Sequence, residues 1–365
     1  MASNKNQHFV PRCYLRPFTL DGANAAINLF NIDRRRFIVG APVKSQCSGD
    51  YFYGEDLQVE HALQGIESAY ARGLVEVSSP GYELRDEHRA LLRQFWLLQY
   101  LRTEAAARRS VEMTAGIAAV AGLGAGDFTM GVRVAVQEAM KVFVDEMDAV
   151  DDLKVCLLRN RTPIPFVTSD DPAVLTNRWH LEDRRTLGRS FALHSAGALF
   201  LLPLTPRILC LGYDGDVYSV PHVGGWADVN RPNDVRAFNQ HQYFNCRANI
   251  FVRDPEHARI VQDDFAAVES LRPGERHRIH YAVFDRSEGG FSRYVVVDPA
   301  EAGAHERAMI HAATVHAKPN GWPSQVTWRR KGVAYSNGTG VGYLREMWAR
   351  FSESEGFRKE LTNRG

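Results

Sequence analysis

The chain has 365 residues, of which 45% are hydrophobic and 24% are charged, the usual balance of a folded, water-soluble protein. Lys and Arg number 44 and Asp and Glu number 43, so the formal net charge is +1. This balance argues against a general polyanion-binding protein, which needs a clear basic excess, but it allows a local basic patch.

The first 55 residues predict a short helix and a pair of strands. Pro11 suits a first helical turn and Pro17 ends it, so we expect a helix at about 11–16. Residues 27–32 and 37–39 read as two strands, and the charged segment 33–36 forms the turn between them.

The segment 56–150 has helical periodicity. We expect one helix that begins near residue 57, a second at 84–109 and a third at 132–150. Five glycines in 116–131 indicate a loop between the second and third helices.

The pattern changes after Lys154 to short apolar or alternating segments bounded by Pro, Gly and Asp. Strands are expected at 154–158, 166–168, 198–202, 208–212, 250–252, 278–284 and 294–297. Helices are expected at 233–246 and 256–271, and a C-terminal helix within 342–365. We therefore predict a single α+β domain over 1–365, in which 56–150 is a helical layer or insertion packed on a mixed, mostly antiparallel sheet.

The cysteines and the N-terminus indicate a cytoplasmic protein. Five widely spaced cysteines without a C-x-x-C pair indicate reduced thiols, and neither a disulfide framework nor a zinc site. The N-terminus has no apolar signal core, and no run of about 18 apolar residues could span a membrane. No cofactor or oligomeric state is indicated.

Two polar side chains of the second helix lie in apolar surroundings. Residues 95–101 read F-W-L-L-Q-Y-L, so this part of the helix is predicted to be buried on most sides. Gln99 lies inside the run, and Arg102 follows on the same face as Phe95 and Leu98. An unpaired buried amide costs roughly 1–3 kcal/mol and a charge costs more, so both need partners. They either serve a site or only fix the packing.

Two other segments carry candidate functional residues. Asp170 follows the strand 166–168 and is a candidate acid, base or metal ligand, or part of an Asx-type turn into Pro172. His8 lies near Tyr14 and Arg16 and is either structural or, if it meets the other polar groups in space, functional. No G-x-x-x-x-G-K-[ST], H-E-x-x-H or G-x-S-x-G motif occurs, and no metal site is predicted.

Several segments resemble one bacterial family. The opening N-Q-H-F-V-P-R-C-Y-L-R-P-F-T resembles the H-x-V-P-x-x-Y-L-x-x-F start of the family labelled domain of unknown function 4238. F-W-L-L-Q-Y-L-R-T, T-S-D-D-P-A-V and F-L-L-P-L-T-P-R-I-L-C-L resemble its Q-x-x-R helix, its T-S-D-x-P segment and its P-L-[ST]-P strand pair. The segment N-D-V-R-A-F-N-Q-H-Q-Y-F-N-C-R-A-N-I-F-V places Asn239 at the family's asparagine. The resemblance covers residues from about 6 to 255.

The resemblance implies a shared site but no activity. It implies that seven residues belong together: His8, Tyr14, Arg16, Gln99, Arg102, Asp170 and Asn239. The chain departs from the family at Asp171, where relatives often carry Asn, and this carboxylate would add a negative charge to the site.

Three functions fit this set of residues. The first is a hydrolase acting on a phosphate-bearing substrate, such as a nuclease or nucleotide hydrolase. His8 and Asp170 would be catalytic, and the other five residues would bind substrate, with Arg16 and Arg102 holding the anion. The second is a non-catalytic sensor of a nucleotide or other small anion. The third is a structural polar core without activity. Nucleic acid stays open as a partner.

Overall fold

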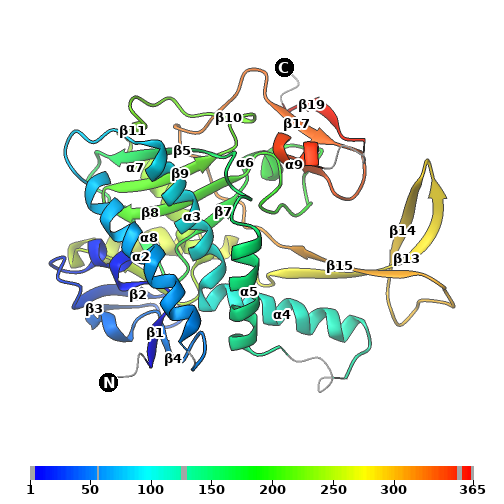
Figure 1. The fold of residues 1–365 in the computed structure, drawn as a ribbon, viewed down its shortest axis with the longest axis horizontal. Coiled ribbons are helices and arrows are strands. Elements are labelled where there is room, and N and C mark those ends of the chain that lie inside the picture. Colours follow the sequence, from blue (N-terminus) through cyan, green and yellow to red (C-terminus); the bar gives the residue numbers. More distant parts are fainter. Residues whose placement is uncertain (1–4, 56, 125–129, 352–355, 363–365) are drawn as a thin grey trace.

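A five-stranded sheet forms the centre of the fold (Figure 1). The structure is a computed structural model that describes residues 5–55, 57–124, 130–351 and 356–362. The strand order in this sheet is β11 (Trp226–Val229), β5 (Lys154–Asn160), β9 (Ile208–Tyr213), β8 (Leu199–Thr205) and β7 (Val174–Thr176). Only β11 and β5 run parallel in it; the other pairs are antiparallel.

Both faces of this sheet are buried because its strands alternate between two hydrophobic clusters. Phe200 and Leu202 of β8 pack into the cluster that includes helix α3 (Asp86–Arg102). Leu199 and Leu201 of the same strand pack into the cluster that includes α7 (Pro232–Asn245). A strand covered on both faces is apolar at successive positions, which explains the continuous apolar run of β8.

A second antiparallel sheet has the order β3 (Arg36–Pro42), β2 (Ala26–Asn31), β12 (Asn249–Val252) and β6 (Thr168–Ser169). The predicted N-terminal strand pair is therefore confirmed, and it joins strands from the second half of the chain. The expectation of one mixed sheet is wrong in this detail, because β12 and β6 pair with the N-terminal strands and not with the central sheet.

Four helices form the predicted layer: α2 (Gln58–Val77), α3, α4 (Glu104–Val120) and α5 (Val132–Asp145). The predicted helix 84–109 is two helices, because Thr103 has an extended backbone and its hydroxyl caps α4 by accepting from the Ala106 amide. The predicted loop at 116–131 is wrong for residues 116–120, because α4 continues to Val120. Residues 125–129 of that loop lie outside the described part of the chain.

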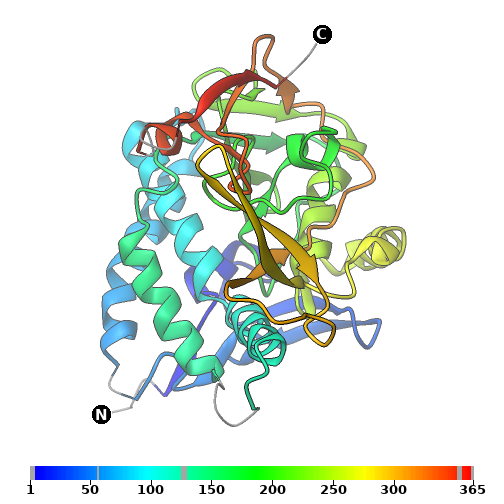
Figure 2. The ribbon, with the colours of Figure 1, turned by 90° about the vertical axis from the view of Figure 1, so that its right-hand side faces the viewer.

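A three-stranded sheet projects from the body beside α4 (Figures 1 and 2). Its order is β14 (Phe291–Val297), β13 (His277–Glu288) and β15 (Ala308–Thr314). The remaining elements are short. They are β1 (Asn6–His8), α1 (Arg12–Leu15), β4 (Ser48–Asp50), α6 (Arg178–Glu182), β10 (Tyr218–Ser219), α8 (Ala258–Ala266) and β16 (Thr327–Trp328).

The predicted C-terminal helix is wrong for most of its length. The segment contains β18 (Tyr343–Leu344), α9 (Glu346–Phe351) and β19 (Arg358–Leu361), and residues 352–355 and 363–365 lie outside the described part. Both β18 and β19 pair with β17 (Val333–Ser336). Gly342 and Gly356 have positive φ angles, which a helix interior does not accommodate, so the chain turns at both positions.

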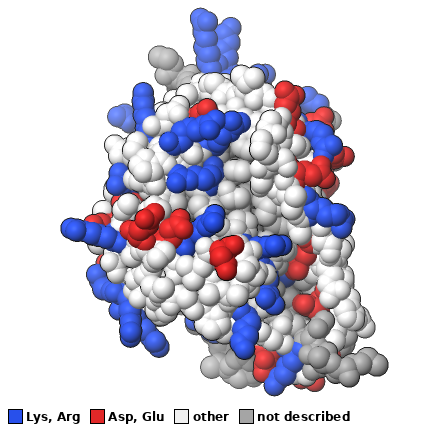
Figure 3. Space-filling model, turned by 90° about the vertical axis from the view of Figure 1, so that its left-hand side faces the viewer, with Lys and Arg blue, Asp and Glu red and all other residues white. Residues whose placement is uncertain are grey.

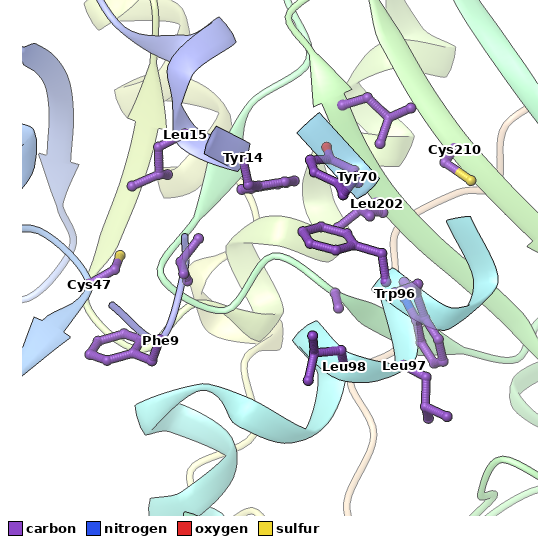
Figure 4. Close-up of a cluster of buried hydrophobic side chains, with 14 of the residues drawn as sticks. Phe9, Tyr14, Leu15, Cys47, Tyr70, Trp96, Leu97, Leu98, Leu202 and Cys210 are labelled. Atoms are coloured by element: carbon purple, nitrogen blue, oxygen red, sulfur yellow. The ribbon is translucent and has the colours of Figure 1, made fainter. Parts of the chain in front are cut away.

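The architecture is thus α+β, with a helical layer on mostly antiparallel sheets, as predicted. Figure 4 shows the core at the contact between the two, where Tyr70, Trp96 and Leu98 meet Leu202 and residues of the N-terminal segment. On the face opposite the projecting sheet, basic and acidic side chains are interspersed (Figure 3). No helix in the described ranges combines the length and apolarity that a membrane span needs.

Candidate functional site

Arg102 lies at the end of α3 and is fully buried. Its guanidinium donates to the Tyr53 hydroxyl at 2.7 Å, to Glu67 Oε1 at 2.8 Å and to the His8 carbonyl at 2.8 Å. The three bonds tie the N-terminal segment and α2 to α3. The predicted burial and the predicted partners of Arg102 are both found.

His8 meets Arg102 through its backbone and not through its ring. The Nδ1 atom is enclosed and has no hydrogen-bond partner among the described residues. Burial, together with the positive charges of Arg12 and Arg102, lowers the pKa of His8 to about 4, although the Gln46 carbonyl raises it. The imidazole is therefore neutral at pH 7.

Tyr14 and Gln99 are both buried in the core. The Tyr14 hydroxyl shares a 2.7 Å hydrogen bond with Thr168 Oγ1 and donates to the Pro203 carbonyl at 2.7 Å, so it connects α1 to both sheets. Neither amide atom of Gln99 has a partner in the described part of the chain, although we expected one.

Asp170 and Asn239 hold backbone segments in place. The Asp170 carboxylate accepts from the amides of Arg247, Ala248 and Asn249 at 2.8, 2.8 and 3.0 Å, and so fixes the turn between α7 and β12. Asn239 accepts from the Val167 amide at 3.1 Å and donates to the Pro165 carbonyl at 2.9 Å. These contacts favour structural roles.

Hydrogen bonds connect the seven predicted residues only in part. Arg16 is exposed, and its Nε donates to the Gly22 carbonyl at 2.9 Å. Among the described residues, no hydrogen bond or ion pair joins His8 to Asp170. His8 and Arg102 meet directly, and Tyr14 reaches the strand that leads to Asp170.

The charge state of Asp170 makes a testable contribution to stability. Burial raises the pKa of Asp170 to about 6, although the three amide hydrogen bonds lower it. The folded state therefore holds this proton more tightly than the unfolded chain, in which an Asp has a pKa of about 3.9. We expect the free energy of unfolding to fall by about 2–3 kcal/mol as pH rises from about 4 to about 6.

The measurement is urea unfolding at several pH values for the wild type and Asp170→Asn. The difference between the two isolates this carboxyl from Asp214, whose burial also raises its pKa to about 6. If the wild type instead becomes more stable than the variant as pH rises from about 4 to about 6, the amide hydrogen bonds affect the pKa of Asp170 more than burial does.

A cavity of about 90 Å³ lies at the base of the projecting sheet, outside the predicted set of residues. It is lined by side chains from α3, α4, β7, α7 and the segments before β13 and after β15. Its polar lining comprises Tyr100, Arg109, Thr176, His241, Asn245, Arg276, Thr314 and His316.

A second hollow of about 190 Å³ adjoins this cavity. The two share Arg109, Asn245 and Arg276. The second hollow adds four charged side chains: Arg108, Glu112, Arg247 and Arg272. We call the two hollows together the arginine cavity.

The end of α7 positions two of these arginines. Arg272 donates to the carbonyls of Tyr243 and Cys246, and Arg276 donates to the carbonyl of Phe244 at 2.9 Å. Carbonyls at a helix C-terminus carry partial negative charge and lack intrahelical partners, so they attract cations. The local sequence thus fixes both guanidiniums at the wall of the cavity.

The cavity has more positive than negative charge. Arg109 pairs with Asp171 at 2.6 Å, and Glu104 pairs with both Arg108 and Arg247, at 2.7 and 3.5 Å. Within the described part of the chain, no carboxylate lies within 4.0 Å of Arg272 or Arg276. Burial lowers the pKa of Arg276, and the charges of Arg109 and Arg272 lower it further, against Asp171, which raises it.

Asp171 connects the T-S-D-D-P-A-V segment to this cavity. Its second oxygen accepts from Thr103 Oγ1 at 2.6 Å, and its own carbonyl accepts from Asn245 at 2.7 Å. Of the two adjacent carboxylates, Asp171 and not Asp170 lies beside an arginine of the cavity wall. The sequence signal that could have found the site is the basic segment after α8, which contains Arg272, Arg276 and Arg278.

The fold and the site define an α+β protein with an arginine-lined cavity between its helical layer, α7 and a projecting sheet. Residues 6–256 match the family described as Protein of unknown function (DUF4238), and the chain belongs to this family. No curated protein and no solved structure matches this chain. Arg272, Arg276 and His316 lie beyond the matched residues.

Proposed function

We propose that the chain binds a small phosphate-bearing anion in the arginine cavity. The observation that carries this proposal is Arg276, a partly buried guanidinium held beside Arg109 and Arg272 with no paired carboxylate among the described residues. Like charges in a poorly solvated site repel one another, and an anion between them removes that cost. Guanidinium groups bind phosphate oxygens through paired hydrogen bonds.

The other polar groups of the cavity suit an anion as well. Burial lowers the pKa of both His241 and His316 to about 4, so both rings are neutral at pH 7 and each carries one N–H, although His316 Nε2 already contacts the Phe191 backbone. The inner hollow, at about 90 Å³, is several times the roughly 10–15 Å³ that one water requires. It therefore suits an inorganic phosphate or the phosphate end of a nucleotide.

Calorimetric titration with inorganic phosphate tests the proposal. Arg276→Gln should weaken binding at least tenfold, because the variant loses a charged hydrogen-bond donor worth about 1.5–3 kcal/mol. The matched control is Arg278→Gln, two residues away and exposed, which should bind as the wild type does. Equal affinities of Arg276→Gln and the wild type would rule out this site.

A second variant in the same titration should change the affinity in the opposite direction. Asp171→Asn keeps an acceptor for Thr103 but leaves Arg109 without its ion pair. The freed guanidinium should bind phosphate more tightly, by about the tenfold that one charged contact provides. Weaker binding in this variant would mean that Asp171 orients Arg109 for the ligand and does not compete with it.

Hydrolysis of the bound molecule is the second candidate function. It is favoured by His241, a buried and neutral imidazole in the wall of the same cavity, which has the protonation state of a general base. The assay is phosphate release from pyrophosphate, with His241→Gln expected to lose turnover but keep phosphate binding. Catalysis by His8 and Asp170 stays a prediction, and the contacts of both residues give it less support than His241 has.

We further propose that this is a bacterial cytoplasmic protein. All five cysteines are free, as expected in a reducing compartment.

A further inference from the structure

A groove that shares no residue with the arginine cavity lies where β5 and β11 end. It consists of two adjoining hollows of about 330 and 700 Å³. They share four residues: Gly81, Tyr82, Arg159 and Trp226.

The smaller hollow combines an apolar floor with a basic rim. Val77, Tyr82, Ile208 and Trp226 line it with apolar surface. The rim carries three arginines from separate segments: Arg159 at the end of β5, Arg161 in the loop that follows, and Arg207 in the β8–β9 turn.

Hydrogen bonds brace these segments in place. Asn160 donates to the Ile164 carbonyl at 2.6 Å and accepts from the Thr162 amide at 2.9 Å, which fixes the loop that carries Arg161. The Trp226 indole donates to the Tyr82 carbonyl at 2.6 Å, which fixes the aromatic wall. The groove is therefore largely formed before any ligand arrives.

The positive charges of the rim are incompletely balanced. Asp228 pairs with Arg159 at 3.8 Å and with Arg161 at 3.4 Å, so one carboxylate serves two guanidiniums. Arg207 donates to the Thr162 carbonyl and has no carboxylate within 4.0 Å in the described residues. The Arg159 guanidinium lies over the Trp226 ring at 4.7 Å, an arrangement that can extend to a further flat ring.

We infer that this groove binds a free nucleotide. A planar base would lie along the Tyr82–Trp226 wall, where aromatic and guanidinium surfaces stack on flat rings. The phosphate would lie between Arg161 and Arg207, which present charged donors to it. A nucleic-acid strand is disfavoured because acidic side chains are interspersed with the basic ones on the face that Figure 3 shows and the net charge is only +1. The inference does not rest on the function proposed for the arginine cavity.

Calorimetry with adenosine monophosphate tests the inference, with adenosine and inorganic phosphate as separate probes of its two halves. All titrations use an Arg276→Gln background, which removes the binding proposed for the arginine cavity, and in it Arg161→Gln combined with Arg207→Gln should weaken binding of the nucleotide at least tenfold. The control is Arg293→Gln, an exposed arginine on β14. Thermal melts establish that each variant is folded.

Trp226→Phe provides an independent test, because it makes the aromatic wall smaller without removing a charge. It should weaken binding of adenosine monophosphate more than binding of phosphate alone. The inference is overturned if the nucleotide does not bind, or if the double arginine variant binds it as the wild type does. A ten-nucleotide deoxythymidine strand that binds more tightly than the mononucleotide would also overturn it and would indicate a nucleic-acid surface.

Discussion

Replacing Arg102 with methionine is expected to lower the free energy of unfolding by about 3–5 kcal/mol. Arg102 is fully buried, and its three hydrogen bonds join the His8 carbonyl, Tyr53 and Glu67. Methionine fills part of the space but removes the guanidinium donor from all three oxygen atoms, and among the described residues only the His8 carbonyl keeps another donor, the Tyr53 hydroxyl at 3.3 Å. Each unsatisfied buried group costs about 1–3 kcal/mol. Urea unfolding followed by circular dichroism measures the loss.

The control for Arg102 is Arg108→Met on the next helix. Arg108 forms a partly exposed i,i+4 ion pair with Glu104, and pairs near the surface contribute about 0–1 kcal/mol. If Arg102→Met lowers the free energy of unfolding by less than 1 kcal/mol, the hydrogen bonds of Arg102 do not hold the N-terminal segment on α3. The buried charge would then have a role other than stability.

Truncating Leu98 to alanine is expected to cost about 2–5 kcal/mol, the range for buried leucines. Leu98 is fully buried in the cluster that Figure 4 shows, between α3 and the N-terminal segment. The lost transfer free energy and the remaining cavity both contribute. Leu187→Ala is the matched control, because Leu187 is 62% exposed and should change stability by less than about 0.5 kcal/mol. Similar losses for the two variants would contradict the packing described for α3.

Local periodicity explains what could be predicted about the fold. The run F-W-L-L-Q-Y-L has apolar residues on every side, and this alone predicts that Gln99 is buried. The change from helical to strand-like spacing near Lys154 likewise marks the end of the helical layer. Such signals need no knowledge of distant partners.

The errors come from residues whose partners lie far away in the chain. At the break, the Thr103 hydroxyl that caps α4 also donates to Asp171, 68 positions later, and the local sequence does not reveal this contact. The strand β19 exists because β17 offers a partner, which helical propensity around it does not reveal.

The candidate site could be predicted only in part for the same reason. His8 and Arg102 do meet, but the amides that surround Asp170 come from 247–249. The arginine cavity takes Arg109 from α4 and Arg276 from the approach to β13, so no motif with fixed spacing joins them. Only the fold brings their charges together.

The most direct test of the account is the position of a bound anion in a crystal. Crystals soaked in tungstate, a phosphate-shaped anion, should give an anomalous peak within hydrogen-bond distance of the Arg276 guanidinium, with Arg109 or Arg272 on its other side. Arg276→Gln crystals soaked in the same way should lose this peak. A wild-type crystal with tungstate bound elsewhere and none in the arginine cavity would contradict the proposed function.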